Sequence, residues 1–423
     1  MIVYQANILF TSSPTHFDVY ERGYIAVDES GIIQGVYDAL PKDFTYDQLV
    51  DFGDKLLIPA MNDMHVHAPQ FANMGVAMDM QLLPWLNTYV FPEEAKFADE
   101  AYAETIYHSF VSELWRQGTM RAAVFATVHT PATHILARTF DEAGMGAWIG
   151  LVGMDRHAPA NLCNTSAEWE AGIQTLTDAL ASMPLVKPII TPRFIPSCTP
   201  EMLRCMGEVA KHTLLPVQSH LSENKQEIAW VKELEPESSC YGDAYYRYGL
   251  FGQTPTLMAH CCYTDGEELQ LMREQNVYAV HCPTSNCNLA SGIAPVRKLL
   301  QQGVNVALGS DIAGGHHLSM FRVMQYAVQM SKLQYTASDG KYPFLTLSEV
   351  FHMATKIGGS LFGKVGSFEK GYAFDALVID DLCLSPHHLI TSSPIERLER
   401  FVYLGDDRHI QHRFCQGNEI KQV

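Results

Sequence analysis

Short apolar runs alternate with amphipathic stretches through the middle of the chain. Eight of these runs are rich in aliphatic and β-branched residues and have the length of buried strands. They cover residues 55–67, 120–128, 147–155, 187–194, 215–221, 256–262, 277–283 and 305–311. The intervening stretches carry apolar residues at helical spacing, as in residues 99–118, 199–212 and 266–276. Eight strands joined by crossover helices indicate an α/β fold, a (β/α)8 TIM barrel.

Both ends of the chain carry a strand pattern instead. Residues 21–40 contain two apolar runs joined by the string DESG, which predicts a hairpin. Near the other end, Gly417 and Asn418 suit a tight turn. Neither end is long enough to bury a sheet alone, so we expect the two ends to pair into one small β-sandwich. The expected domains are residues 1–58 with 364–423 for this β-sandwich, and residues 59–363 for the barrel.

Polar residues with metal-binding chemistry stand where the predicted strands end. In a barrel of this kind, catalytic groups lie at the carboxyl ends of the strands and in the loops that follow. His65 and His67 share one face of the first strand, because residues i and i+2 of a strand point the same way. The later strands end in Arg193, His220, His260, His281 and Asp311.

Three imidazoles and one carboxylate from this rim form a candidate metal site: His65, His67, His220 and Asp311. Such nitrogen and oxygen ligands suit zinc, and iron(II) or manganese accepts the same set. Glu223 follows His220 by three residues. It could be an ordinary acid in a first helical turn. Beside these ligands, however, we expect it to move protons.

The other histidines are not assigned as ligands. His281 is consistent with a hydrogen-bonded core imidazole. His316 and His317 follow a Gly-Gly pair and are expected to be solvated or to shape the substrate site. Four more belong to the C-terminal part, away from the barrel mouth: His387, His388, His409 and His412.

Composition narrows the range of partners. With 29 basic and 47 acidic residues and a net charge of -18, the chain is not expected to bind a nucleic-acid backbone. The first residues lack the pattern of a signal peptide, and no apolar run is long enough to span a membrane. We therefore expect no membrane contact and a cytoplasmic location. Ten scattered cysteines are expected to be reduced thiols.

Several of these motifs together resemble the amidohydrolase superfamily, in its mononuclear aminohydrolase branch: MHVHAPQ, SHLSE, MAHC and GSDIAGG. Longer strings resemble the guanine deaminases within that branch, among them HVHAPQFANMG, LPWLNTYVFPEEAKF, TPRFIPSC and HCPTSN. The resemblance spans almost the whole chain. It implies a barrel with a terminal β domain, one Zn²⁺ per chain, a small-molecule purine substrate and a homodimer.

Carried over position by position, the resemblance assigns three sets of residues. The metal ligands are His65, His67, His220 and Asp311. The catalytic residues are Glu223 as proton shuttle, His260 beside the attacking water or the substrate, and Asp311. The substrate-binding residues are His67, Gln70, Arg193, Phe194, His220, Glu223 and Asp311.

The implied reaction is hydrolytic deamination of guanine to xanthine and ammonia. The alternatives are a related aminohydrolase acting on 8-oxoguanine, a pterin, an adenosine derivative or a chlorotriazine, and a barrel without catalytic activity. Two features bear on the choice. Arg193 ends the fourth strand where dinuclear relatives carry a lysine, which favours a single metal ion. His316 and His317 depart from the family pattern, so the fine specificity stays open.

Overall fold

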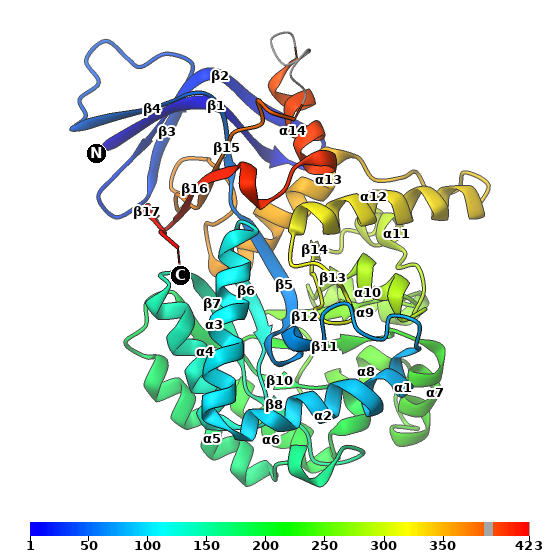
Figure 1. The fold of residues 1–423 in the computed structure, drawn as a ribbon. Helices are drawn as coiled ribbons and strands as arrows, with labels where there is room; N and C mark the ends of the chain where they lie inside the picture. Colours follow the sequence, from blue (N-terminus) through cyan, green and yellow to red (C-terminus); the bar gives the residue numbers. More distant parts are fainter. Residues whose placement is uncertain (385–391, 423) are drawn as a thin grey trace.

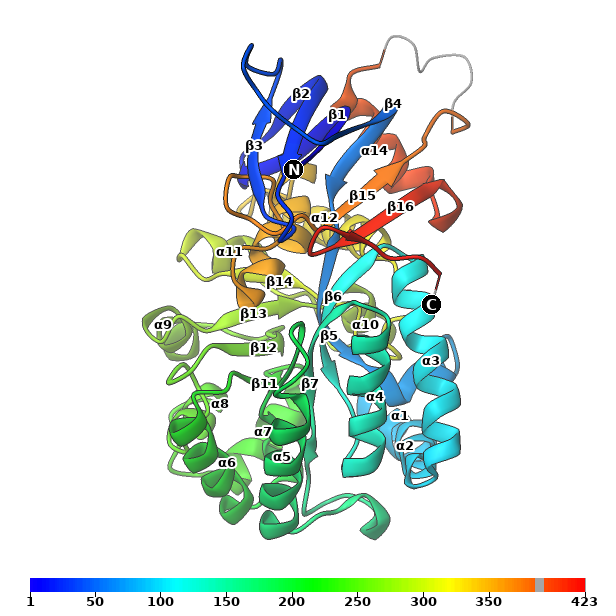
Figure 2. The ribbon, with the colours of Figure 1, turned by 90° about the vertical axis from the view of Figure 1, so that its left-hand side faces the viewer.

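The structure is a computed structural model that describes residues 1–384 and 392–422. Figure 1 shows a mixed α/β fold with two parts: a sheet that contains both ends of the chain, and a body of parallel strands. Helices surround the parallel strands, as the turned view in Figure 2 makes clear. No helix within the described ranges is both long and apolar enough to cross a membrane. All ten cysteines lie in those ranges and are free thiols.

Strands from both chain ends form one seven-stranded sheet in the order β17-β16-β15-β4-β1-β2-β3. The strands are β1 Ile2–Ser13, β2 His16–Val27, β3 Ile33–Tyr37, β4 Gln48–Pro59, β15 Ala376–Ile379, β16 Ile410–Cys415 and β17 Asn418–Glu419. The predicted hairpin is confirmed, because β2 and β3 pair antiparallel. The last turn lies one residue earlier than predicted. Gln416 and Gly417 hold left-handed φ angles of 50° and 79°, while Asn418 already pairs with Cys415.

This terminal sheet differs from the two-layer sandwich that the sequence pattern predicts, because its described strands pair into a single sheet. The pairing of β1 with both of its neighbours shifts register along the strand. Such irregularities bend a sheet and increase its twist. The bent sheet covers a cluster that includes Tyr4, Phe10, Phe52, Phe368, Phe374 and Phe414. Phe368 and Phe374 belong to the segment before β15, so this segment packs against the sheet where a second layer of strands was expected.

All eight predicted strand regions of the body form strands, and the strands pair in parallel. Two four-stranded sheets have the orders β5-β6-β7-β9 and β11-β12-β13-β14, and β8 pairs with β10. The strands are β5 Met61–His67, β6 Thr119–Phe125, β7 Gly146–Gly150, β8 Val152–Gly153, β9 Val186–Pro188, β10 Thr191–Pro192, β11 Val217–Leu221, β12 Thr256–His260, β13 Tyr278–His281 and β14 Val306–Leu308. A parallel bridge between Ile190 and Val217 links one pair of edges. At the other pair of edges, the backbone N–H of Asp311 donates to the His65 carbonyl at 2.8 Å.

The first predicted strand region, residues 55–67, is two strands in different sheets. β4 ends at Pro59 in the terminal sheet, and β5 begins the parallel body at Met61. Between them, the N–H of Ala60 donates to the Asp375 carbonyl at 3.0 Å. Every residue from Leu56 to His67 is buried, so the burial pattern does not reveal where the chain changes sheet.

The three helices predicted above form α3 Glu100–Arg116, α6 Pro200–Thr213 and α9 Gly266–Glu274. Each begins at a side-chain cap, supplied by Asp99, Thr199 and Asp265 respectively. The other α-helices are α1 Leu82–Trp85, α2 Phe91–Glu94, α4 Thr130–Glu142, α5 Ser166–Leu180, α7 Lys225–Leu234, α8 Tyr241–Tyr246, α10 Pro283–Asn288, α11 Val296–Gln301, α12 Met320–Ala337, α13 Leu347–His352 and α14 Pro394–Leu404.

A buried ion pair ties the terminal sheet to the beginning of the parallel strands. Arg121 on β6 donates through Nε to Asp375 Oδ2 at 2.5 Å and through Nη2 to Oδ1 at 3.2 Å. Both side chains are buried. Because Arg121 belongs to the amino-terminal half of β6, the terminal sheet meets the body at that end of the strands. The carboxyl ends, where the polar residues gather, are left for the site.

Candidate metal centre and active site

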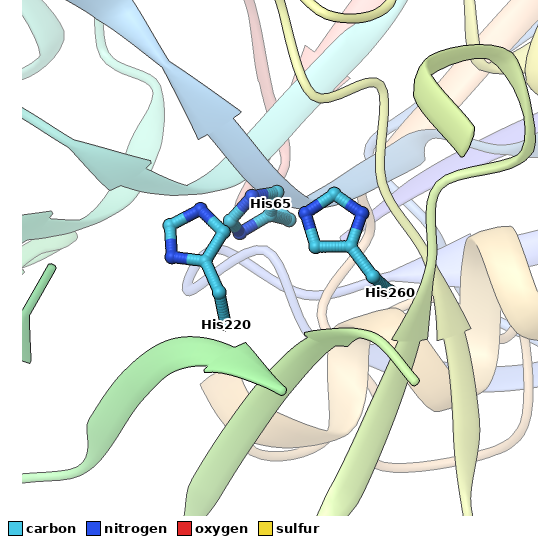
Figure 3. A group of neighbouring side chains, drawn as sticks. All are labelled: His65, His220 and His260. Carbon is cyan, nitrogen blue, oxygen red and sulfur yellow. The ribbon is translucent and has the colours of Figure 1, made fainter. Parts of the chain in front are cut away.

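Side chains from four separate strand ends converge on one point of the parallel body. Asp311 Oδ1 lies 3.2 Å from His65 Nε2 and 3.5 Å from His67 Nε2. His67 Nε2 lies 3.2 Å from His220 Nε2. Figure 3 shows the imidazoles of His65, His220 and His260 turned toward one another from β5, β11 and β12. The structure thus brings together every residue that the sequence suggested as a ligand.

The spacing of these atoms fits a single divalent ion. Atoms placed tetrahedrally about 2.0–2.1 Å from a zinc-sized ion lie about 3.3 Å from one another. The three distances above fall between 3.2 and 3.5 Å. In addition, His65 Nε2 is buried and finds no hydrogen-bond partner in the described residues. Two overlapping groups, His65 with His67 and Asp311, and His65 with His220 and His260, each hold their ligand atoms within 4.8 Å of one another. This cluster of histidines and Asp311 therefore suits a divalent metal ion.

Burial keeps the imidazoles of this cluster in the form that binds a metal. It lowers the pKa of His65, and it lowers the pKa values of His67 and His220 well below the ordinary histidine value. All three rings are therefore neutral near pH 7, with a nitrogen lone pair available. Phe125 of β6 packs against the three rings, with centroid distances of 4.5 to 5.0 Å.

Hydrogen bonds outside the cluster orient two of the rings. His220 Nδ1 donates to the backbone carbonyl of Arg193 at 2.6 Å, which leaves Nε2 for the cluster. His260 Nδ1 lies 2.9 Å from Oδ1 of Asn286 on α10. His260 Nε2 consequently faces Glu223 Oε2 at 3.6 Å and Asp311 Oδ2 at 3.7 Å. Asn286 is a site residue that the sequence analysis missed.

Backbone geometry at the rim is adapted to this convergence. Asp311 and His260 hold φ angles of 49° and 71°, which side-chain-bearing residues rarely adopt. Such strain persists where the surrounding structure imposes it, often at functional sites. At Gly309 a Cβ atom would lie 2.8 Å from His65 Cβ. Only glycine allows the segment after β14 to approach β5 this closely.

Glu223 is buried at the edge of the cluster, and it is not in a helix. Asn224 caps α7, and Glu227 is the acid of its first turn. The ordinary explanation of Glu223 as a helix-start acid is therefore wrong. Its Oε1 accepts a hydrogen bond from Ser291 Oγ at 2.7 Å, while Oε2 faces His260. Burial raises the pKa of Glu223, and burial together with the neighbouring Glu223 raises the pKa of Glu227 to about 7.

A pocket that opens to solvent connects the cluster to the other predicted site residues. It is lined by His67, Gln70, Leu82, Trp85, Leu86, Arg193, Phe194, His220, Glu223, Glu227, His260, Leu289 and Asp311. Every predicted substrate-binding residue lines this pocket. The sequence pattern was not used to predict the apolar wall of this pocket, although Trp85 and Leu86 belong to the string LPWLNTYVFPEEAKF and Leu82 stands directly before it, all at helical spacing. Their spacing could have suggested a common face.

The histidines that were set aside lie apart from the cluster. His281 at the end of β13 is buried, which lowers its pKa to about 3, but its Nδ1 has no hydrogen-bond partner in the described part of the chain. It is therefore a neutral core imidazole without the hydrogen bond expected at that nitrogen. His316 contacts Asn288 at 2.9 Å, and His317 beside it is exposed. His409 and His412 pair with Asp406 and Glu419 in the terminal part of the chain. The remaining two, His387 and His388, lie outside the described residues.

Comparisons with known proteins agree with this geometry. Residues 56–420 match the amidohydrolase family. The chain is 36% identical to a guanine deaminase of Dictyostelium discoideum over 443 residues, which covers 99% of this chain and 98% of that protein. A crystal structure of guanine deaminase from C. acetobutylicum with guanine in its active site matches with a TM-score of 0.96 and 48% identity over 99% of each chain. Guanine deaminase of E. coli matches with a TM-score of 0.90 and 28% identity over 100% of each chain. The chain belongs to the amidohydrolase family and, within it, to the guanine deaminases.

Proposed function

We propose that this protein hydrolyses guanine to xanthine and ammonia. One observation carries the proposal. The buried histidine-aspartate cluster, Glu223 and the hydrogen-bond donors of Gln70 and Arg193 all line the same pocket. The cluster and the carboxylate suit hydrolysis of a ring amine, and the donors suit an oxopurine. Similarity to a guanine deaminase that holds guanine in its active site supports the same substrate.

We further propose that the metal ion is zinc, one per chain, held by His65, His67, His220 and Asp311. Neutral imidazole nitrogens and one carboxylate oxygen are ligands that zinc prefers, while Fe²⁺ or Mn²⁺ would also accept them. When bound, such an ion acts as a Lewis acid that lowers the pKa of a water molecule and provides a nucleophile near neutral pH.

Glu223 moves the protons of the reaction. Its carboxylate accepts a proton from the attacking water and delivers it to N3 of guanine, which makes C2 electrophilic. Oxygen then bonds to C2. Glu223 next carries a proton to the exocyclic amine, the C2–N bond breaks and ammonia leaves, so that water and guanine give xanthine and ammonia. Burial raises the pKa of the Glu223 carboxyl, so it holds a proton more readily than an exposed glutamate does, which suits a group that both accepts and delivers protons.

His260 and Asp311 orient the attacking water. His260 Nε2 faces carboxylate oxygens of both Glu223 and Asp311, so a water between these groups has donors and acceptors on several sides. The hydrogen bond that His260 Nδ1 donates to Asn286 Oδ1 keeps the His260 ring in this orientation. These residues therefore bring the nucleophile and the proton carrier to the same side of the purine.

Gln70 and Arg193 bind the acceptor edge of the purine, and Phe194 walls the ring. Both polar side chains offer N–H groups, which pair with O6 and N7 of guanine. Adenine has an amine at C6, and a buried donor without a partner costs about 1–3 kcal/mol. Phe194 is buried at the pocket surface and supplies apolar contact.

We also propose that the two parallel sheets close into a (β/α)8 barrel over residues 59–363, with residues 1–58 and 364–423 as the appended β domain. The Ile190–Val217 bridge and the hydrogen bond from Asp311 to His65 support closure at both pairs of edges. Family membership further supports a homodimer in the cytoplasm. Light scattering on the purified chain and cell fractionation test these two expectations.

A substrate panel tests the proposed reaction. Purified protein of measured metal content is incubated with guanine, 8-oxoguanine, a pterin, an adenosine derivative and a chlorotriazine, and ammonia release is followed. We expect xanthine and ammonia in equal amounts from guanine at much the highest kcat/KM. Unreacted guanine beside rapid turnover of another compound would overturn the choice of substrate. Absence of a tightly bound divalent ion and of all turnover would favour a barrel without catalytic activity.

A further inference from the structure

Glu94, at the end of α2, lies behind the polar wall of the pocket and binds both residues of that wall. Arg193 Nη1 donates to its Oε1 at 2.9 Å and to its Oε2 at 2.8 Å. Gln70 Nε2 donates to Oε1 at 3.0 Å. The Glu94 and Arg193 side chains are each 4% exposed. Neither the motifs nor the comparisons give this buried carboxylate a role.

The contacts of Gln70 determine which end of its amide faces the substrate. Its Oε1 accepts from the backbone N–H of Ala313 at 3.1 Å, and its Nε2 donates to Glu94. Ala313 N–H can only donate, and an ionised carboxylate can only accept, so the amide has one allowed orientation. The carbonyl oxygen is thereby directed at Ala313, whose N–H occupies one of its two lone pairs. The second N–H of Nε2 is left for a ligand.

The guanidinium of Arg193 is held on two sides by the same helix. Glu94 engages Nη1, and the ring of Phe91, at the other end of α2, lies 5.4 Å from the guanidinium carbon. An arginine fork held in this way keeps its remaining N–H groups in fixed directions. Gln70 and Arg193 together thus present fixed N–H donors to the pocket.

We propose that Glu94 is a positioning residue that sets the purine specificity of this site: by binding Gln70 and Arg193 together, it keeps their N–H donors facing the pocket and selects purines with an acceptor at C6. The inference rests on the proposed function and deepens it. Without the carboxylate, the Gln70 amide can rotate and present its carbonyl, which would accept a hydrogen bond from a C6 amine. Selectivity against a C6 donor would then fall, while the chemistry at C2 is untouched.

Three substrates that differ at C6 test this role, since each carries the reacting amine at C2; guanine also has a hydrogen on N1, whereas the other two share an unprotonated N1, so their comparison isolates the C6 amine. Guanine has an acceptor at C6, 2-aminopurine has hydrogen there and 2,6-diaminopurine has a donor. For Glu94→Gln we expect kcat/KM for guanine to fall about 10- to 100-fold, mainly through KM, because hydrogen bonds to O6 are weakened. The preference for guanine over 2,6-diaminopurine should shrink at least about 10-fold. Metal content should equal that of the wild type.

Glu93→Gln is the matched control. Glu93 is the neighbouring buried acid on α2, and it binds Lys96 and Tyr102 instead of the pocket wall. Its removal should leave the ratio of the two purines unchanged. If Glu94→Gln does not fold, Glu94→Asp takes its place. This change retains the charge but withdraws the carboxylate oxygens from Gln70 and Arg193 by one methylene, and it should also reduce the preference for guanine over 2,6-diaminopurine.

The outcomes separate the inference from the function on which it rests. A wild-type protein that leaves guanine unreacted refutes the proposed function. Wild-type turnover of guanine, combined with an unchanged guanine to 2,6-diaminopurine ratio in the folded Glu94 variant, refutes the role of Glu94 alone. An equal loss for all three substrates, or a loss of bound metal, also overturns it, because such a result indicates a structural role.

Discussion

Arg193→Met separates what Arg193 contributes to substrate binding from what it contributes to folding. The change removes the partner of Glu94 at a site where both side chains are 4% exposed. Removing one member of a buried pair costs about 3–5 kcal/mol of unfolding free energy, because the other charge stays buried without compensation. Loss of the donor to O6 adds a separate cost of about 1–3 kcal/mol in guanine binding, a rise in KM of about 5- to 150-fold.

Urea denaturation and steady-state kinetics measure the two costs on the same preparations. In the double variant Arg193→Met with Glu94→Gln, both charges are gone, so most of the lost unfolding free energy should return. The guanine KM should stay high, because no donor has been restored. Metal content serves as the control for an intact cluster. Recovery of the wild-type KM in the double variant would refute the reasoning, since guanine binding would then not depend on the Arg193 guanidinium.

Three further predictions concern proton transfer, the metal and pH. Glu223→Gln should retain bound metal but lose at least about 10²- to 10⁴-fold in kcat, because the proton carrier is gone; near-normal kcat would remove Glu223 from the mechanism. Removal of the ion with a chelator should abolish guanine turnover and lower Tm, and added Zn²⁺ should restore both, whereas full activity in metal-free protein would contradict the assigned ligands. Burial, with Lys356 nearby, lowers the pKa of His352 from 6.5 to about 4. As pH falls, His352 is therefore protonated in the unfolded chain before it is protonated in the folded one. The free energy of unfolding should decrease as pH drops from 6.5 toward 4, by at most about 3 kcal/mol before solvent screening. His352→Gln should reduce that slope in urea titrations at pH 7 and 4.5, and an unchanged slope would assign it to other groups.

Strand periodicity was sufficient to locate the parallel strands, because each is short and apolar and is separated from the next by a stretch with helical spacing. It was insufficient where one apolar run serves two sheets, as at the passage from Pro59 to Met61. It also predicted two layers for the terminal part, where one bent sheet forms. Local pattern reports how buried a residue is. The pattern does not indicate which other strand or helix packs against that residue.

The candidate metal ligands were accessible from the sequence because each stands at or just after the end of a predicted strand, and a parallel fold brings such ends to one rim. The groups that orient the side chains of the site could not be predicted from the sequence. Asn286 reaches His260 across 26 positions of sequence, and Ser291 reaches Glu223 across 68. Such contacts depend on the direction of individual side chains in loops and short helices, and periodicity carries no information about that direction.

The sequence by itself determined the class of fold and the family and suggested the candidate ligands, because spacing along strands and residue chemistry are local properties of the chain. Only the tertiary structure decided how the purine wall is built. Glu94 stands next to Glu93 in an ordinary helix, and nothing in the string FPEEAKF distinguishes the two acids. Packing turns one toward Lys96 and the other toward Gln70 and Arg193. The specificity that we propose for this site therefore depends on a helix rotation that only long-range packing determines.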